Sequence, residues 1–69
     1  MQNIQLEFYE CEHNTDLDNY LDDVIECGGE IVNSRVDYDG EIGYVVVAVE
    51  NRAEFMTKFQ ETEASQFLN

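Results

Sequence analysis

The sequence predicts an α+β domain whose elements follow the order strand, helix, strand, strand, helix. Three observations predict it: an alternating apolar segment near the N-terminus, a helical apolar stripe within residues 15–27, and two apolar segments joined by Asp39-Gly40. With 69 residues, the chain has the length of one domain, which we expect to span residues 1–69. An antiparallel sheet with both helices packed on one face satisfies this order.

The first strand is predicted from the segment NIQLEFY. Apolar and polar side chains alternate along it, which is typical of a strand with one buried face. Ile4, Leu6 and Phe8 are therefore expected to face the core.

The first helix is predicted over residues 15–27. Thr15 is a favourable N-cap, and Asp18 stands at the position of a capping box. Glycine tolerates the left-handed conformation that ends many helices, so Gly28-Gly29 is expected to terminate this one. The apolar side chains recur with helical spacing and predict the buried stripe: Leu17, Leu21, Val24 and Ile25.

The second and third strands are predicted to form a hairpin around Asp39-Gly40, a favoured pair for a two-residue turn. Pairing across this turn sets Val36 opposite Gly43 and Val32 opposite Val47. The face expected to meet the helices carries Val32, Val36, Val45, Val47 and Val49. The other face is mixed and carries Ile31, Asn33, Arg35, Asp37, Ile42, Tyr44, Val46 and Ala48, with Arg35 opposite Tyr44.

The second helix is predicted to begin after Asn51, an N-cap residue with Glu54 at the capping-box position. Its core side chains are expected to be Phe55, Met56 and Phe59. Residues 60–69 fit either a continued helix or a short closing strand. The order of elements resembles ferredoxin-like domains or a truncated variant of them, which implies a fold but no function.

The charge is strongly one-sided, with 16 acids, three bases and a net charge of −13. Residues 1–34 hold nine acids and no Lys or Arg. This argues against membranes and against direct nucleic-acid binding, which needs cations to displace counterions from phosphate. The chain shows no apolar segment of membrane-spanning length and no secretory signal pattern. We therefore expect a cytoplasmic protein with a basic protein partner.

Catalytic and metal sites are not supported by the sequence. Cys11 and Cys27 are interpreted as reduced thiols, although a bridge between them stays open. With His13 they give three soft ligands at unusual spacing for zinc, and acidic surroundings disfavour a reactive thiolate. Calcium loops starting at Asp16 or Asp37 lack the required glycine at position 6. We expect no enzyme activity, no metal and no cofactor.

The acids of residues 15–30 carry the functional hypothesis. Asp18, Asp22 and Glu26 are four residues apart and recur about every 6 Å along a helix. Like charges at this spacing destabilise a helix, so the row suggests a partner that neutralises it. A solvated face with no partner is the other interpretation. The candidate partner-binding residues are Asp16, Asp18, Asp22, Asp23 and Glu26, a second patch at the hairpin of Glu30, Asp37, Asp39 and Glu41, and the aromatic residues Tyr20 and Tyr38.

In its size, its charge and the acid-rich segment TDLDNYLDDVIECGGE, the chain resembles small phage-encoded inhibitors that mimic nucleic acid. The resemblance is to this functional class and rests on no alignable motif. It implies a non-enzymatic protein in the cytoplasm of a bacterial host that occupies the nucleic-acid groove of a host protein, as anti-restriction and anti-CRISPR proteins do. The alternative is a small acidic adaptor that binds a basic protein through its sheet face, at Ile42, Tyr44 and Val46. A homodimer is compatible with either.

Overall fold

The computed structural model describes residues 1–68. The elements are β1 (Gln2–Phe8), α1 (Asn14–Glu26), β2 (Glu30–Asp37), β3 (Ile42–Val49), α2 (Arg52–Phe59) and a 3₁₀ helix, η1 (Ala64–Phe67). The three strands form one antiparallel sheet in the order β1-β3-β2, with β3 in the centre. The predicted α+β class and order of elements are therefore confirmed.

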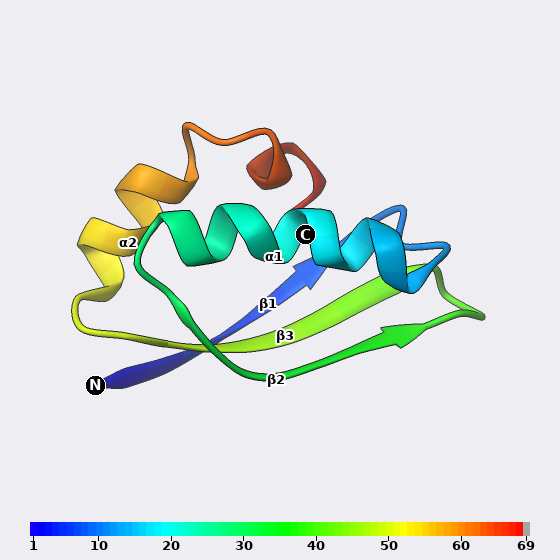
Figure 1. Cartoon of the computed structure of the whole chain (residues 1–69), viewed down its shortest axis with the longest axis horizontal. Coiled ribbons are helices and arrows are strands. Elements are labelled where there is room, and N and C mark those ends of the chain that lie inside the picture. The colour runs from blue at the N-terminus through cyan, green and yellow to red at the C-terminus, as the bar shows by residue number, and fades with distance from the viewer. Residues whose placement is uncertain (69) are drawn as a thin grey trace.

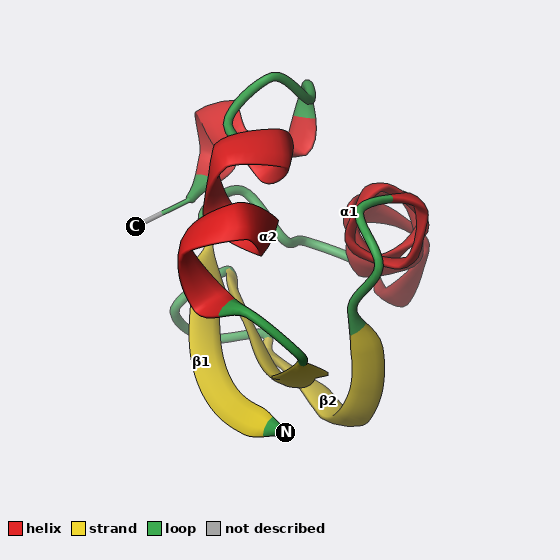
Figure 2. Cartoon of the chain, turned by 90° about the vertical axis from the view of Figure 1, so that its left-hand side faces the viewer, coloured by secondary structure: helices red, strands yellow, loops and turns green. Residues whose placement is uncertain are grey.

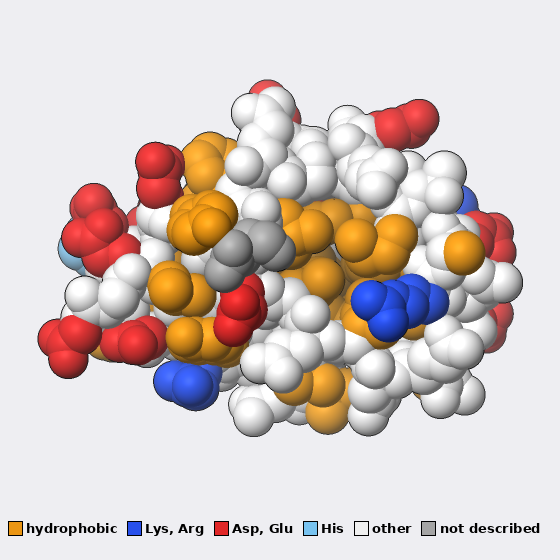
Figure 3. Space-filling view, turned by 180° about the vertical axis from the view of Figure 1, so that it is seen from behind, with side chains coloured by type: hydrophobic (Ala, Val, Ile, Leu, Met, Phe, Trp, Pro, Cys, Tyr) orange, Lys and Arg blue, Asp and Glu red, His pale blue; other side chains and the backbone are white. Residues whose placement is uncertain are grey.

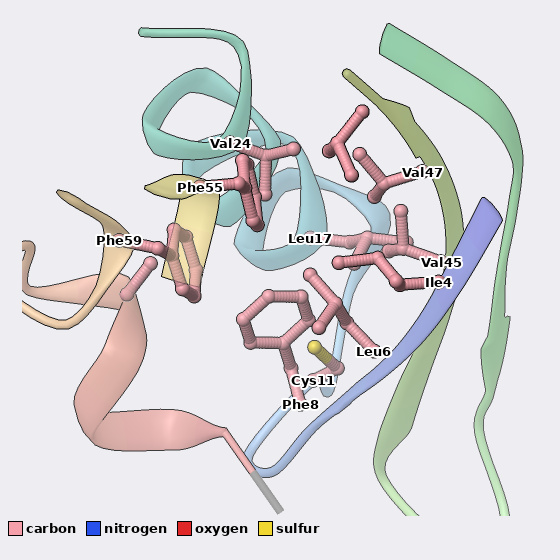
Figure 4. Close-up of a cluster of buried hydrophobic side chains, with 12 residues drawn as sticks. Ile4, Leu6, Phe8, Cys11, Leu17, Val24, Val45, Val47, Phe55 and Phe59 are labelled. Atoms are coloured by element: carbon pink, nitrogen blue, oxygen red, sulfur yellow. The ribbon is translucent and has the colours of Figure 1, made fainter. Parts of the chain in front are cut away.

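The molecule has two layers, with the sheet on one side and both helices on the other (Figures 1 and 2). The core lies between the layers, and all of the described elements except β2 supply at least one buried side chain to it. Figure 4 shows side chains from β1, β3, α1 and α2 pointing toward one another. The buried residues include Ile4, Leu6, Phe8, Leu17, Val24, Val45, Val47, Phe55 and Phe59.

The first helix starts slightly earlier than predicted. Its N-cap is His13, not Thr15, and Asp16 occupies the capping-box position that was predicted for Asp18. At the other end, Gly28 adopts φ +92°, so the predicted glycine termination is confirmed. Gly29 also lies where a Cβ atom would come within 2.7 Å of Val47 Cγ1, so the close approach of helix and sheet requires glycine there.

The buried stripe of α1 is rotated from the predicted one. Ile25 is 56% exposed, while Tyr20 packs against the core beside Leu17, Leu21 and Val24. The Tyr20 ring stacks on Phe8, with ring centroids 5.1 Å apart. Burial of this aromatic ring accounts for the rotation of the buried stripe.

The hairpin keeps the predicted register near the turn but changes it further along. Val36 pairs with Gly43, and Asp37 pairs with Ile42, so the connection is a four-residue loop and not a two-residue turn. A β-bulge between Ile31 and Asn33 then shifts the register by one residue. Since side chains alternate between faces, the bulge turns Ile31 toward the core and leaves Val32 56% exposed. The predicted pairing of Val32 with Val47 is wrong for this reason.

The C-terminal residues combine parts of both predicted alternatives. Residues 64–67 form the short η1, and Leu68 then makes an isolated antiparallel bridge with Phe8 at the outer edge of β1. The Tyr9 N–H donates to the Phe67 carbonyl at 2.6 Å. Asn69 lies outside the described residues, so the prediction for that residue stays open.

The N-cap of α2 gives a first testable prediction. The Asn51 Oδ1 atom accepts a hydrogen bond from Glu54 N at 3.0 Å, as the sequence predicted. Asn51→Ala should lower the free energy of unfolding by about 1 kcal/mol, because it leaves that N–H without its cap. Urea unfolding followed by circular dichroism measures the change. Asn19→Ala, the same change inside α1, should not destabilise, and equal losses from both variants would contradict the capping role.

Candidate functional site

Three acidic side chains form a row on the face of α1 that points away from the core. Asp18, Asp22 and Glu26 are all exposed, and none of them makes a hydrogen bond or ion pair with any of the described residues 1–68. The row spans about 12 Å along the helix axis. The helix that carries these side chains is held against the core by Leu17 and Val24 on its opposite face.

The other two acids of α1 have structural roles. Asp16 Oδ2 accepts hydrogen bonds from the backbone N–H groups of Glu12 and His13, each at 3.2 Å. Asp23 Oδ2 accepts one from Ala64 N at 3.2 Å and thereby ties η1 to α1. Both side chains are half-buried, so they contribute less to an accessible acidic surface than the row does.

The hairpin loop contributes a second, smaller acidic group. Asp37 Oδ1 accepts hydrogen bonds from Asp39 N at 3.1 Å and Gly40 N at 3.3 Å, so it shapes the loop. Asp39 and Glu41 are exposed. The Cys11 N–H donates to the Glu41 carbonyl at 2.9 Å, which ties this loop to the segment preceding α1. The N-terminal end of α1 and the hairpin lie at the same end of the molecule (Figure 1).

Glu30 does not belong to the hairpin patch, and its predicted place there is wrong. It is the first residue of β2, whereas the loop follows the last residue, Asp37. A strand of this length separates the two ends by about 23 Å. Glu30 lies instead beside the end of α1, where it lines a shallow hollow with Cys27, Gly28 and Lys58.

The two candidate aromatic residues differ in accessibility. Tyr38 is 57% exposed at the acidic loop and is free to contact a partner. The Tyr20 ring is stacked between Phe8 and Phe67, with a centroid distance of 5.1 Å to each. Burial is the main cause that raises the pKa of Tyr20. Of the two, Tyr38 is therefore the one suited to a protein interface.

None of the three cations forms an ion pair with the acidic row in the described residues 1–68. Among residues 1–68, the ion pair found is Lys58–Glu54, at 3.7 Å between exposed side chains, which contributes little to stability. The Arg35 guanidinium lies 4.3 Å from the centroid of Tyr44, on the outer face of the sheet. Arg52 is exposed at the start of α2.

The cysteines are both free thiols. Cys11 is completely buried in the core, and burial is the main cause that raises its pKa, followed by the charge of Asp16. Burial also raises the pKa of Cys27. Both thiols therefore stay protonated near neutral pH, which opposes a nucleophilic role.

This difference in burial gives a second prediction. In the folded protein, a thiol-specific chromogenic reagent should label Cys27 and leave Cys11 unreacted, while urea should make both react. Cys27→Ser should abolish the labelling of the folded protein, and Cys11→Ser should preserve it. Rapid labelling of Cys11 in the native state would contradict its burial.

Neither a metal cluster nor a membrane span is found in the described part of the chain. Residues 1–68 contain no group of three or more His, Cys, Asp or Glu side chains placed to hold a metal ion. No helix within these residues is long and apolar enough to cross a membrane. The feature on which an interaction hypothesis can rest is the exposed acidic row of α1.

The different roles of the acids could have been read in part from helical spacing. Asp18, Asp22 and Glu26 follow one another at four-residue steps, whereas Asp16 and Asp23 are seven residues apart and lie on a different side of α1. No local signal indicates that Asp23 meets Ala64, because 41 residues separate them. No protein-family model, curated protein or solved structure significantly matches the chain.

Proposed function

We propose that this protein is a non-enzymatic inhibitor that occupies the basic nucleic-acid-binding groove of another protein with the acidic face of α1. The observation that carries the proposal is the row of Asp18, Asp22 and Glu26, which is exposed and has no neutralising partner among residues 1–68. The hairpin loop extends the surface with Asp39, Glu41 and Tyr38.

The length of the row suits a contact along a nucleic-acid-binding groove. One strand of a duplex carries a phosphate about every 3.4 Å along the helix axis, so the roughly 12 Å row, with carboxylates about 6 Å apart, covers the length of about four phosphates at a lower density of charge. The side chains project from a helix that is fixed by its packing on the core. A preorganised acidic surface loses little conformational freedom when it enters a Lys- and Arg-lined groove.

The class of partner follows from the same chemistry. A protein that binds DNA or RNA presents cations spaced to meet phosphates, and it attracts this field at long range. The resemblance to phage-encoded inhibitors makes a bacterial restriction enzyme, CRISPR effector, nucleoid protein or repair glycosylase the proposed target. The inhibitor would then act in the cytoplasm of the host cell.

The experiment is capture followed by competition. The immobilised protein is incubated with bacterial lysate at low salt, captured proteins are identified, and duplex DNA is then added. The proposal expects a nucleic-acid-binding protein that is released by DNA and that binds more weakly as salt rises. If the captured protein stays bound at saturating DNA, the two surfaces do not overlap and the proposal is wrong.

A second candidate is an adaptor that binds a basic protein through the outer face of the sheet. The observation that favours it is that both helices cover the other face (Figure 2), so the face carrying Ile42, Tyr44 and Val46 has no second layer. Arg35 already lies against the Tyr44 ring, which reduces the aromatic surface left for a partner. Tyr44→Ala would abolish capture by an adaptor and would leave capture by the acidic row unchanged.

A further inference from the structure

The outer edge of β1 is open along residues 2–6 of the described structure. In the described structure, β1 pairs with β3 on one side, and on the other side its pairing is the single bridge from Phe8 to Leu68. The Tyr9 N–H points outward, toward Phe67. Since backbone groups alternate in direction along an antiparallel strand, the N–H and C=O groups of Asn3 and Gln5 point the same way. They are ready to bond another strand.

The two edges of the sheet differ in their protection against such pairing. The β2 edge carries the bulge at Val32 and the charged residues Glu30, Arg35 and Asp37, which are features that hinder pairing between edges. Residues 1–6 contain no acidic or basic side chain, although the remaining 63 residues contain all 16 acids. The β1 edge also has no proline and no bulge.

On the face of the molecule that contains β1, the surface around the strand is less acidic than the rim. Figure 3 views the molecule from the β1 side, and hydrophobic side chains gather in its middle while acidic ones lie mostly around its rim. A hollow of about 500 Å³ next to the start of β1 is lined by residues that include Gln2, Glu50, Arg52 and Met56. Another, of about 430 Å³ at the far end of the strand, is lined by residues that include Tyr9, Glu10, Glu41 and Phe67, so the acids lie at the two ends of the strand.

We propose that β1 pairs antiparallel with β1 of a second copy, so that the two sheets join into one continuous six-stranded sheet. The distribution of charged side chains favours a second copy of the chain as the partner of this edge. A two-fold axis at this edge places residues 1–6 of the two copies together, and these residues carry no acidic or basic side chain. For a molecule with a net charge of −13, an edge without acidic side chains lowers the repulsion between two copies.

The structure also fixes the register. Leu68 occupies the edge at Phe8, so the segment left for pairing is centred on Ile4. With Ile4 on the two-fold axis, Asn3 faces Gln5 of the second copy, and each of these pairs exchanges two backbone hydrogen bonds. The amide side chains of Asn3 and Gln5, exposed on the outer face, then lie opposite each other without like-charge repulsion.

The salt dependence separates this proposal from the proposed function, on which it does not rest. Raising salt from about 0.01 M to about 1 M shortens the Debye length from about 30 Å to about 3 Å. Repulsion between two acidic copies is then screened, so the dimer should strengthen by about tenfold or more, whereas binding to a basic partner weakens. Sedimentation velocity over a concentration series at each salt measures the dimer.

Charge placement tests the edge and the register. Asn3→Lys with Gln5→Lys sets lysines opposite each other and should weaken dimerisation by about tenfold or more, even though it lowers the net negative charge. Asn33→Lys with Ser34→Lys is the matched control on the β2 edge and should leave the dimer intact or strengthen it. Asn3→Lys with Gln5→Glu sets Lys opposite Glu and should restore dimerisation.

The outcomes that overturn the proposal are specific. A wild-type protein that stays monomeric at every salt and concentration has no such pairing. A dimer that survives Asn3→Lys with Gln5→Lys uses another surface. Failure of Asn3→Lys with Gln5→Glu to restore the dimer excludes the register centred on Ile4. Circular dichroism and urea unfolding of each variant confirm that the changes at these exposed positions leave the fold intact.

Discussion

Reversing Asp18, Asp22 and Glu26 to lysine is expected to weaken binding of the captured partner by more than about a hundredfold at low salt. Each exposed carboxylate in the row contributes on the order of 1 kcal/mol to a complementary contact, and about 1.4 kcal/mol corresponds to a tenfold change in affinity. Reversal also replaces each attraction by a repulsion. Titration of the purified partner at several salt concentrations measures the change.

The matched control places the same charge reversals elsewhere. Glu50, Glu61 and Glu63 are exposed at the start of α2 and in the loop that follows it. Their triple change to lysine alters the net charge equally and should retain most of the affinity. Equal losses from both triple variants would show that the total charge matters and that the row does not, which contradicts the proposed site.

A single reversal separates binding from stability. Asp22→Lys converts two repulsive pairs four residues apart, with Asp18 and Glu26, into attractive ones, and should stabilise the fold by up to about 1 kcal/mol. The same variant should bind the partner more weakly. A gain in stability together with a loss of binding would identify Asp22 as a residue kept for function at the expense of the helix.

Phe8→Ala should leave most of the protein unfolded at room temperature. Phe8 is completely buried, stacks on Tyr20 and meets the edge of the Phe59 ring at a centroid distance of 6.0 Å. Truncating a buried phenylalanine costs about 3–5 kcal/mol, which is as large as the stability that a core of this size supplies. Urea unfolding followed by circular dichroism measures the loss.

Two further variants serve as controls for the prediction on Phe8→Ala. Tyr38→Ala removes an aromatic ring that is 57% exposed and should change the stability by less than about 0.5 kcal/mol. Phe8→Leu keeps most of the buried volume and should remain folded. A Phe8→Ala protein with an unfolding midpoint close to that of the wild type would show that the three-ring contact is not central to the core.

The elements that could be predicted from the sequence are those specified by local patterns. Alternation identified β1, the Gly28-Gly29 pair marked the end of α1, and Asn51 marked the start of α2. The hairpin register near the loop also followed from the sequence, so Arg35 was correctly placed opposite Tyr44. In each of these, the determining residues lie close together in the chain.

The features that escaped prediction depend on distant contacts. Because of the bulge, Ile31 faces the core in place of Val32. Both residues are apolar and β-branched, so the sequence does not show which of them faces inward. Tyr20 turns inward because Phe67, 47 positions further along, supplies one side of its stack. Cys11 stands among the polar residues Glu10, Glu12 and His13 in the sequence, yet it fills the core where a Cβ on Gly43 would come within 2.8 Å of its sulfur.

The candidate site shows the same division. The row of Asp18, Asp22 and Glu26 follows from helical spacing, and the structure leaves its members exposed as expected. That Glu30 is separate from the hairpin patch is visible only once the length of β2 is known. The structural roles of Asp16 and Asp23 are visible only in their hydrogen bonds. Acidity indicates a candidate residue, but only its contacts distinguish a binding group from a structural one.

The position of β1 in the sheet has a consequence for synthesis on the ribosome. Its partner strand is β3, so Ile4 and Leu6 find their pairs, Val47 and Val45, only after some forty further residues have been made. Until then Ile4 and Leu6 have no strand to join. The nine acids from Glu7 to Glu30 emerge in the same interval, and we expect their repulsion to keep neighbouring nascent chains apart.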